Sequence, residues 1–310
     1  MSISSIIIVN WNTKELTARC IRSIYENVAP EFEVIVVDNG STDGSAEYIR
    51  QLFPDVRLIE NPANEGYARA NNKGIKAAEG DPVILINSDA AVLSKDPVGL
   101  IDKVFAEHPK IGIVGAKQLY PNGKIQSLGR EFVSVKNLVK SQLLFAGAPV
   151  FVKDNGRKII DVDYVDGAFF AIRRRVIEQT GLLNENYFMY AEDMEWCAAA
   201  RDNGWRVAVL PAIEILHEHA ASSLKRYRDI LVYNAVNICR FIAKRQGPGE
   251  AKRAFYVLMA GMLLRIPLSV LRPGKGKLAL DYVIGFKRCY RLLAQLGHIL
   301  KGKEYETGRD

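Results

Sequence analysis

The chain has 310 residues, of which 48% are hydrophobic and 25% are charged, a composition that excludes a disordered chain or a fibrous repeat. The net charge of +7 is unevenly distributed: the 86 residues from Lys225 onward carry 18 basic and 6 acidic side chains, whereas the first 224 residues have a balance of −5. A basic C-terminal region predicts contact with an anionic surface, either phospholipid headgroups or nucleic acid.

The cysteines lie far apart and form no C-x-x-C pair: Cys20, Cys197, Cys239 and Cys289. This spacing argues against a zinc cluster or a disulfide framework and favours a reducing cytoplasm. The N-terminus has no charged segment of the kind that begins a signal peptide, so we expect a cytoplasmic protein.

The first 120 residues alternate short apolar runs with segments of helical periodicity. We expect strands at 4–10, 32–38, 56–60, 82–87 and 111–116, and helices at 14–27, 67–78 and 97–107, with a further helix capped by Asp43. Strands that alternate with helices in this way predict an α/β fold with a mostly parallel sheet covered by helices on both faces.

The pattern then changes twice. Residues 121–161 are expected to form a loop-rich insertion with an apolar run at 143–152, and the regular pattern resumes at 162–172. Helices at 173–180 and 191–203 and a strand at 205–210 are expected to follow. Beyond residue 222 the pattern is helical, at 223–245, 250–271 and 278–301. We therefore expect a catalytic domain over 1–223 and a basic helical region over 224–310.

The segment 254–271 is apolar, but Arg265 and Pro267 interrupt it, and a membrane span needs about 20 apolar residues. Basic residues flank it on both sides: Lys252, Arg253, Arg272, Lys275 and Lys277. This arrangement favours a helix lying in a membrane interface. A helix packed on the body or in a dimer is the alternative, and a true span is the least favoured.

Polar residues close the expected strands, and in such sheets ligands bind outside the carboxyl ends of the strands. Asp38 ends a buried apolar strand and could accept a hydrogen bond from the N–H of a uracil or thymine base. The residues that follow, 39–44 (NGSTDG), are equally explained by ordinary turn chemistry.

Asn87, Ser88 and Asp89 follow another strand, and Asp89 could hold a divalent cation against a diphosphate. One carboxylate is a weak metal site, so a second ligand is needed. His217 is a candidate because imidazole suits Mn²⁺-like ions, although a single histidine is as often a hydrogen-bonded structural residue.

Gly66 opens a helix at residue 67, where backbone amides attract phosphate, and Asn71 and Asn72 are unusual in a helix interior. A capped helix with a polar surface explains this segment as well. Farther along, Glu192, Asp193 and Glu195 lie within four residues of one another. They either complement a helix dipole or supply a general base of raised pKa.

Three common motifs are missing from the sequence: G-x-G-x-x-G after the first strand, the P-loop, and the G-x-S-x-G nucleophile elbow. Their absence argues against a dinucleotide enzyme, a P-loop ATPase and an α/β-hydrolase.

In chain order the motifs are 6–12 (IIIVNWN), 36–44 (VVDNGSTDG), 64–68 (NEGYA), 87–89 (NSD), 165–168 (VDGA), 192–196 (EDMEW), Arg201 with 204–205 (GW), and His217 with 222–223 (SS). Together they resemble the inverting glycosyltransferases of family two, which have the GT-A fold, and especially the bacterial rhamnosyltransferase-like branch. The resemblance covers residues 3–223.

The resemblance implies roles for single residues. Asp193 would be the catalytic base with Glu192 beside it, and Trp196 is expected to contact the acceptor. Asp89 would hold Mg²⁺ or Mn²⁺ together with His217, although Asn87 replaces the first aspartate of the family's D-x-D motif and weakens that site. The donor-binding residues would be Asn10 and Asp38 at the nucleoside, and Asn64, Gly66, Arg69, Asn72, Ser88 and Asp89 at the diphosphate.

The resemblance further implies transfer of a sugar, with L-rhamnose from dTDP-rhamnose as first choice, to a polyprenyl-diphosphate-linked saccharide in cell-envelope polysaccharide biosynthesis. UDP-GlcNAc, UDP-glucose or UDP-galactose are alternative donors, because the base-reading residues suit uracil and thymine equally. The enzyme would lie peripherally on the anionic inner face of the cell membrane. A non-catalytic nucleotide-sugar-binding or scaffold protein is a remote alternative, and nucleic-acid binding is disfavoured because the tail has no run of aromatic stacking platforms.

Overall fold

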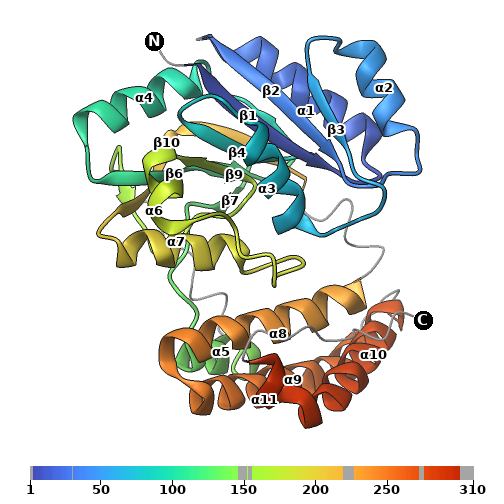
Figure 1. Ribbon diagram of the computed structural model, residues 1–310. Helices are drawn as coiled ribbons and strands as arrows, with labels where there is room; N and C mark the ends of the chain where they lie inside the picture. Colours follow the sequence, from blue (N-terminus) through green and yellow to red (C-terminus); the bar gives the residue numbers. More distant parts are fainter. Residues whose placement is uncertain are drawn as a thin grey trace. The chain divides into compact units, whose positions relative to one another are not determined.

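A computed structural model describes residues 3–29, 31–145, 152, 156–218, 227–271 and 276–300 (Figure 1). The chain forms two compact units. The first consists of Met1–Glu131, Phe151–Phe188 and Glu192–Ser222, and the second of Phe132–Val150, Met189–Ala191 and Ser223–Asp310.

The first unit contains a sheet and the helices that cover it. Its strands are β1 (Ser4–Asn10), β2 (Phe32–Asp38), β3 (Arg57–Glu60), β4 (Val83–Asn87), β5 (Ala90–Val92), β6 (Ile111–Leu119), β7 (Ile125–Ser127), β8 (Ile160–Asp161), β9 (Phe169–Ile172) and β10 (Arg206–His217). Its helices are α1 (Lys14–Asn27), α2 (Ser45–Leu52), α3 (Tyr67–Ala77), α4 (Pro97–Glu107), α6 (Arg174–Thr180) and α7 (Glu192–Asp202).

The strands form one sheet in the order β3-β2-β1-β4-β9-β6-β10-β5, with β7 paired to β6 and β8 to β10. The first four strands of the chain pair in parallel, and so do β6 and β10. Strand β9 runs antiparallel between β4 and β6. The predicted α/β fold with a central sheet flanked by helices is therefore confirmed, but the sheet is mixed rather than mostly parallel, because β5, β7, β8 and β9 all pair antiparallel.

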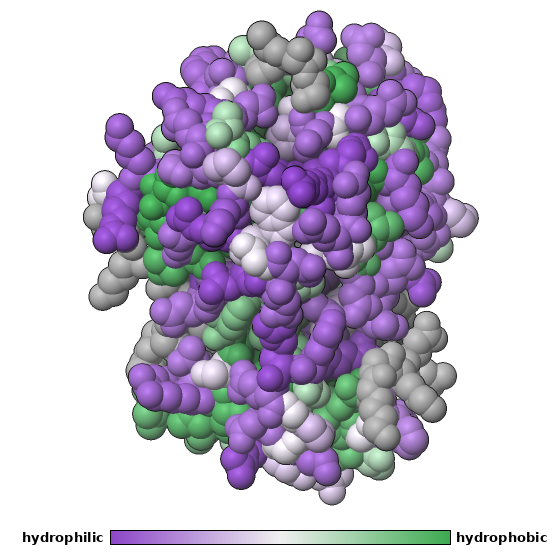
Figure 2. All heavy atoms as spheres, turned by 60° about the vertical axis from the view of Figure 1, so that its left-hand side comes forward, coloured by the Kyte–Doolittle hydropathy of each residue, from purple (hydrophilic) through white to green (hydrophobic). Residues whose placement is uncertain are grey.

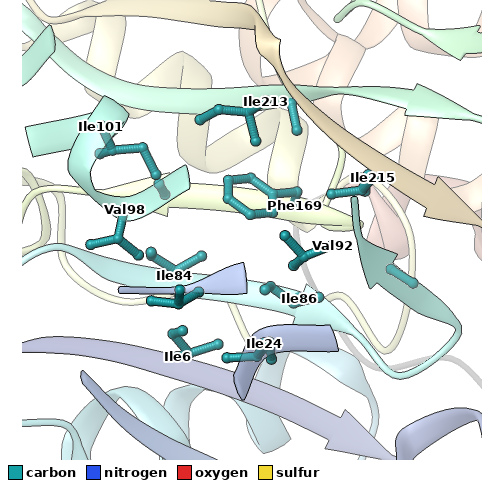
Figure 3. Packing of buried hydrophobic residues seen from close by; sticks show 14 of the residues in the cluster. Ile6, Ile24, Ile84, Ile86, Val92, Val98, Ile101, Phe169, Ile213 and Ile215 are labelled. Carbon is teal, nitrogen blue, oxygen red and sulfur yellow. The ribbon is translucent and has the colours of Figure 1, made fainter. Parts of the chain in front are cut away.

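Alternating side chains of the strands point to opposite faces, and helices cover both. On one face Ile6, Ile84 and Phe169 pack with residues of α1, α2 and α4 in a single buried cluster, part of which is seen in Figure 3. On the other face Phe170 stacks on Trp196 of α7 at 5.3 Å between ring centroids. With both faces buried, the carboxyl ends of the strands remain available for a site.

The described elements of the second unit are helical: α5 (Val135–Gln142), α8 (Tyr227–Gln246), α9 (Pro248–Val270), α10 (Gly276–Leu292), the short 3₁₀ turn η2 (Leu293–Gln295) and α11 (Leu296–Ile299). Helix α9 packs against α5, α8 and α10. Within the described residues, α9 alone has the length and composition of a helix that could cross a membrane, and 39% of its most apolar stretch is buried inside the protein.

Three local expectations differ from the structure. The insertion 121–161 contains two short strands and helix α5, whose Ser134 side chain caps it by accepting from Asn137 N. Strand β10 continues past Pro211 because a register shift between Leu210 and Glu214 accommodates the missing proline N–H. Gly44 is the N-cap of α2, while Asp43 accepts a hydrogen bond from Ser45 N.

Candidate active site

The carboxyl ends of β1 and β2 bring Asn10 and Asp38 together. The two residues are direct partners in the parallel register, and Asn10 Nδ2 donates to Asp38 Oδ1 at 2.6 Å. The other carboxylate oxygen of Asp38 accepts from Ser41 N at 3.0 Å. Asp38 is 3% exposed and is held in one orientation by Asn10 and by the backbone of the turn that follows β2.

Asn10 is enclosed by protein rather than available to a donor. Its side chain is fully buried, and Oδ1 accepts from the hydroxyls of Thr13 at 2.8 Å and Thr17 at 2.7 Å. In this structure Asn10 positions Asp38, and its contact with the donor nucleoside stays a prediction. Thr13 Oγ1 also lies 2.9 Å from Ser88 Oγ, which places Ser88 beside the same end of β1.

The loop before α3 is organised by Asn39, a residue to which the sequence analysis gave no role. Asn39 Nδ2 donates to Asn64 Oδ1 at 3.0 Å and to Gly66 O at 3.2 Å, while its Oδ1 accepts from Glu65 N. Asn64 Oδ1 in turn accepts from Gly66 N at 2.9 Å. The side-chain amides thus fix the backbone on which α3 begins.

The backbone conformation and close packing at position 66 require a glycine. Its φ is +90°, and a Cβ at this position would lie 2.6 Å from Phe188 O. The adjacent Tyr67 N donates to the same carbonyl at 2.7 Å. The entrance to α3 is therefore packed directly against the segment that ends at residue 188, and a side chain there would separate them.

Asn72 and Arg69 of α3 have protein partners. Asn72 is 1% exposed and bonds both ways with the backbone of Leu183, donating to its carbonyl at 2.8 Å and accepting from its amide at 3.0 Å. Its expected place beside the diphosphate stays a prediction. Arg69, about half exposed, lies 3.4 Å from Glu185 and is able to reach a ligand in solvent.

Asp89 and His217 converge although they are far apart in the sequence. His217 Nε2 lies 3.3 Å from Asp89 Oδ1, and both side chains are about 10% exposed. His217 Nε2 is also 3.5 Å from Asn87 Nδ2, while Nδ1 lies 2.9 Å from Gln126 Oε1. The pairing of β5 with β10 produces this arrangement, since Ala90 is the register partner of His217.

Asp89 and His217 could bind a divalent cation, although they would supply only part of its coordination shell. When Gln126 Oε1 accepts the Nδ1 hydrogen, the imidazole presents the Nε2 lone pair toward the Asp89 carboxylate, which is the second-shell arrangement common for metal-bound histidine. One carboxylate and one imidazole are donors that suit Mn²⁺ or Mg²⁺. In the described part of the chain no group of three or more His, Cys, Asp or Glu side chains gathers, so the remaining ligands would be substrate oxygens and water.

Asp193 and Glu192, which begin α7, differ sharply in accessibility. Asp193 is partly exposed, and its carboxylate accepts from Gly167 N at 3.1 Å and Met194 N at 2.7 Å. Glu192 is 5% exposed, and its Oε2 is buried without a hydrogen-bond partner in the described structure. Asp193 can therefore touch a substrate, whereas Glu192 lies behind it.

The burial of this pair changes its protonation. Desolvation, together with the nearby Asp166 carboxylate, raises the pKa of Asp193 to about 6. Desolvation and the charge of Asp193 raise the pKa of Glu192 well above its usual range. The ionised form of Asp193 therefore predominates at neutral pH, while burial and the charge of Asp193 favour the neutral form of Glu192.

Asp166 and Arg130, to which the sequence analysis assigned no function, form the wall beside Asp193. Arg130 Nε lies 2.8 Å from Asp166 Oδ1, and Gln118 Nε2 donates to Asp166 Oδ2 at 3.3 Å. Asp166 belongs to the quoted motif 165–168, which was the signal available for it. Arg130 lies in the insertion, where no local pattern marks it.

The carboxylates of Asp193 and Asp89 both lie near enough to Tyr67 to affect its pKa. Tyr67 donates its hydroxyl hydrogen to Gly167 O at 3.1 Å. Burial raises the pKa of Tyr67 well above its ordinary value, and the carboxylates of Asp193 and Asp89 raise it further. Asp193 and the candidate cation site at Asp89 therefore lie close enough to act on the same tyrosine.

Trp196 is a core residue. It is 4% exposed, stacks on Phe170, and donates its indole N–H to Gly181 O at 2.9 Å. In this structure the ring and the indole N–H of Trp196 are both used inside the protein, and its contact with an acceptor stays a prediction. Of the quoted motifs, residues 222–223 lie outside the described residues.

Comparisons with known proteins agree with this arrangement. The chain matches the family model "Glycosyl transferase family 2" over residues 5–181. It is 26% identical over 258 residues to the N-acetylglucosaminyl-diphospho-decaprenol L-rhamnosyltransferase of Mycobacterium tuberculosis, covering 76% of this chain and 83% of that protein. It is 25% identical over 236 residues to the low-salt glycan biosynthesis hexosyltransferase Agl10 of Haloferax volcanii, covering 74% and 71%.

A third relative is the uncharacterized protein y4gI of Sinorhizobium fredii, 30% identical over 208 residues, but the chain spans only 22% of its length. Among solved structures, the chain resembles the mannosyltransferase PcManGT of Pyrobaculum calidifontis, solved with GDP-Man and Mn²⁺ (TM-score 0.57, 19% identity, 97% of this chain and 85% of that one). It also resembles TarS 1–349 of S. aureus (TM-score 0.52, 17% identity, 98% and 93%). These structural likenesses establish the fold as GT-A.

The matched family model covers more than half of the chain, and it includes the carboxyl ends of β1, β2 and β4. The chain belongs to glycosyltransferase family 2.

Proposed function

We propose that the chain is an inverting glycosyltransferase that moves a sugar from a nucleoside-diphosphate donor to a saccharide carried on a polyprenyl diphosphate. The observation that carries the proposal is the Asp193 carboxylate, partly exposed with a pKa raised to about 6, near the same tyrosine as Asp89, which lies beside His217. A base poised near neutral pH beside a site for a charged leaving group is what a single displacement at an anomeric carbon needs.

In this mechanism Asp193 activates the acceptor hydroxyl for a single displacement. Asp193 takes the proton from the acceptor hydroxyl as that oxygen attacks the anomeric carbon, and the bond to the diphosphate oxygen breaks on the opposite face. Gly167 N and Met194 N hold the carboxylate in place during the transfer. One displacement inverts the anomeric configuration and leaves no covalent enzyme intermediate.

Asp89 and His217 would hold Mg²⁺ or Mn²⁺ at the diphosphate, where the cation supplies compensation for the negative charge of the leaving group. Asn87 lies beside His217 Nε2 as a neutral amide rather than a carboxylate. The protein therefore contributes one negative charge here instead of two, and we expect metal affinity to depend strongly on the bound diphosphate.

For the donor we propose dTDP-L-rhamnose, on the similarity to the mycobacterial rhamnosyltransferase. UDP-GlcNAc, UDP-glucose and UDP-galactose are the alternatives, since Asp38 can accept from the N3–H of uracil or thymine alike. We expect dTDP-rhamnose with Mn²⁺ to raise the thermal midpoint selectively. A ligand at about 100 times its Kd adds roughly 2.7 kcal/mol to the free energy of unfolding, which is readily measured.

The control is the same panel with GDP-mannose added and with the divalent cation chelated. A larger shift with a UDP-sugar would replace rhamnose by that sugar and leave the transferase intact. Equal shifts with every nucleotide, or none with any, would contradict a base-selective donor site at Asp38.

We further propose that the second unit docks on the inner face of the cell membrane. Hydrophobic areas are visible over this unit in Figure 2. Its exposed large apolar side chains lie on its helices and just beyond the ends of α5 and α9: Leu144, Phe145, Tyr256, Leu263, Leu264, Leu268, Val270, Leu271, Leu280 and Tyr290. On α9 the exposed residues change along the helix, from Lys252 and Arg253 near its start to leucines near its end. Apolar residues beside cations are the composition of an interfacial helix.

Replacing both Leu268 and Leu271 by aspartate should reduce binding to anionic vesicles by about tenfold or more, because each leucine contributes roughly 1.5–3 kcal/mol when fully buried. Cosedimentation with phosphatidylglycerol vesicles measures the effect. The matched control replaces Leu52 and Leu93 of the first unit, which are 43% and 47% exposed, by the same residue. Equal loss in both variants, or loss in neither, would contradict docking through α9.

A further inference from the structure

Asn237 of α8 is a fully buried polar side chain to which the proposed reaction gives no role. Its amide nitrogen donates to two consecutive backbone carbonyls, to Met189 O at 2.8 Å and to Tyr190 O at 3.2 Å. Residues 189–191 are part of the second unit, as α8 is, so both hydrogen bonds lie within that unit. One side chain therefore fixes two successive peptide groups.

The other half of the Asn237 amide is unfavourable for stability. Its Oδ1 is buried with no hydrogen-bond partner in the described structure. An unpaired buried acceptor destabilises the folded state, whereas a leucine of similar shape would bring no polar atom into the interior. What the asparagine offers over a leucine is therefore the pair of N–H groups on the carbonyls of residues 189 and 190.

The backbone that Asn237 holds has an unusual conformation. Tyr190 and Ala191 both have a φ of +71°, in the left-handed region that side chains with a Cβ rarely adopt. The two carbonyls bonded by Asn237 belong to the peptide planes on either side of Tyr190. Because peptide groups are planar, fixing both planes fixes φ and ψ of Tyr190 and the direction in which Ala191 begins. The hydrogen bonds thus supply the constraint that a strained backbone needs in order to persist.

The candidate base follows this strained pair directly in the chain. Ala191 is succeeded by Glu192 and Asp193, with which α7 begins. A helix usually starts from an extended residue whose side chain caps the first amides, and Ala191 has neither that conformation nor a side-chain acceptor. The place of Asp193 therefore depends on the backbone path through residues 190 and 191. Displacing a catalytic group by about 1 Å is enough to lower a rate by about 100-fold.

We propose that Asn237 is a positioning residue for sugar transfer, whose two hydrogen bonds hold residues 189–191 in the conformation that presents Asp193 to the acceptor hydroxyl. The inference rests on the proposed function, in which Asp193 is the base, and deepens it by naming what fixes that base. Since Asn237 is fully buried, it acts through the backbone of residues 189–191 and not by touching substrate.

Asn237→Leu is expected to lower kcat by about tenfold to 100-fold, because the carboxylate of Asp193 is no longer held in place. The donor Kd should stay within about twofold, since Asn237 contacts no ligand. Asn234→Leu makes the same substitution three residues earlier on α8, at a partly exposed position, and should leave kcat within about twofold. Equal losses of kcat in the two variants, or a loss in neither, would overturn the proposal.

Glycine at position 191 provides a rescue. It enters the left-handed region without steric cost, so adding Ala191→Gly to Asn237→Leu should restore kcat to within about threefold of the unaltered protein. Ala191→Val tests the same conformation with Asn237 intact, and also serves if Asn237→Leu does not fold. A β-branched residue opposes positive φ, so kcat should fall by about tenfold. A double variant as slow as Asn237→Leu, or unchanged kcat in Ala191→Val, would contradict the proposal.

A measurement without substrates separates this inference from the proposed reaction. The Gly167 amide donates to Asp193 Oδ2, so its hydrogen exchange, followed by NMR, reports whether the carboxylate is in place. In Asn237→Leu we expect this amide to exchange about tenfold faster or more, with the Ile7 amide of β1 within about twofold. Equal acceleration of both amides would indicate a general loss of stability and overturn a positioning role. A selective effect at Gly167 in a protein that transfers no sugar would contradict the proposed function alone.

Discussion

Asp193→Asn is expected to lower sugar transfer by about 10²–10⁴-fold, the usual contribution of a positioned general base, with donor affinity nearly unchanged. The amide cannot accept the acceptor's proton, yet it has almost the same shape and still accepts one of the two backbone hydrogen bonds. Single-turnover transfer assays measure the rate, and thermal shift with the donor measures binding. A variant that keeps most of its activity would remove Asp193 from the mechanism.

The pH profile offers a second readout of the same residue. Since the pKa of Asp193 is about 6, transfer should increase as pH rises through 6 and then level off, because only the ionised carboxylate acts as a base. The raised pKa also means that the folded state binds protons more tightly than the unfolded chain. Stability from this group is therefore lost as pH rises from about 4 through 6, so that at pH 7 the charge opposes folding.

Two controls follow from the difference between the neighbouring acids. Glu192→Gln should keep most of the transfer activity, because Glu192 is buried and its raised pKa favours the neutral form that glutamine mimics. Asp193→Asn should show a thermal midpoint no lower than that of the unaltered protein, since it removes a desolvated charge. Comparable losses of activity in both variants would indicate that the pair shares the role and that the division proposed here is wrong.

Much of the fold could be predicted because its signals are local. Buried runs of β-branched residues gave the bounds of β1 and β2, and the helical spacing gave those of α1 and α4. Topology then placed Asp38 at the carboxyl edge without any knowledge of tertiary contacts. Strand β9 could not be placed this way, because its antiparallel position between β4 and β6 depends on pairing between segments far apart in the chain.

The roles of single polar residues were harder to predict, because the burial of a side chain depends on which face of its helix or strand packs against the rest of the protein. The residue types of Asn72 and Trp196 predict ligand contacts, but tertiary packing buries both side chains. Gln126 and Arg130 were not predicted as site residues, because no local pattern marks them. They lie in an irregular insertion and reach His217 and Asp166 only after the sheet has formed.

The candidate cation site yields the second large effect. Asp89→Asn should reduce metal-dependent transfer by about 100-fold, since it removes the single protein carboxylate beside His217. Chelation of the unaltered protein should have a similar effect on activity. Binding of Mn²⁺ in the presence of the nucleoside diphosphate, followed by electron paramagnetic resonance, provides a readout that does not depend on turnover.

Asn87→Asp makes the opposite change at the same place and should strengthen Mn²⁺ binding by about tenfold, because a second negative charge enters within 3.5 Å of His217 Nε2. The matched control is Asn203→Asp, which adds the same charge at an exposed position beyond α7 and should leave Mn²⁺ binding unchanged. If Asn87→Asp and Asp89→Asn both leave Mn²⁺ binding and transfer as they were, the protein performs its reaction without a cation at Asp89. In that case the diphosphate must be neutralised by other cationic groups, of which the half-exposed Arg69 would be the first to replace.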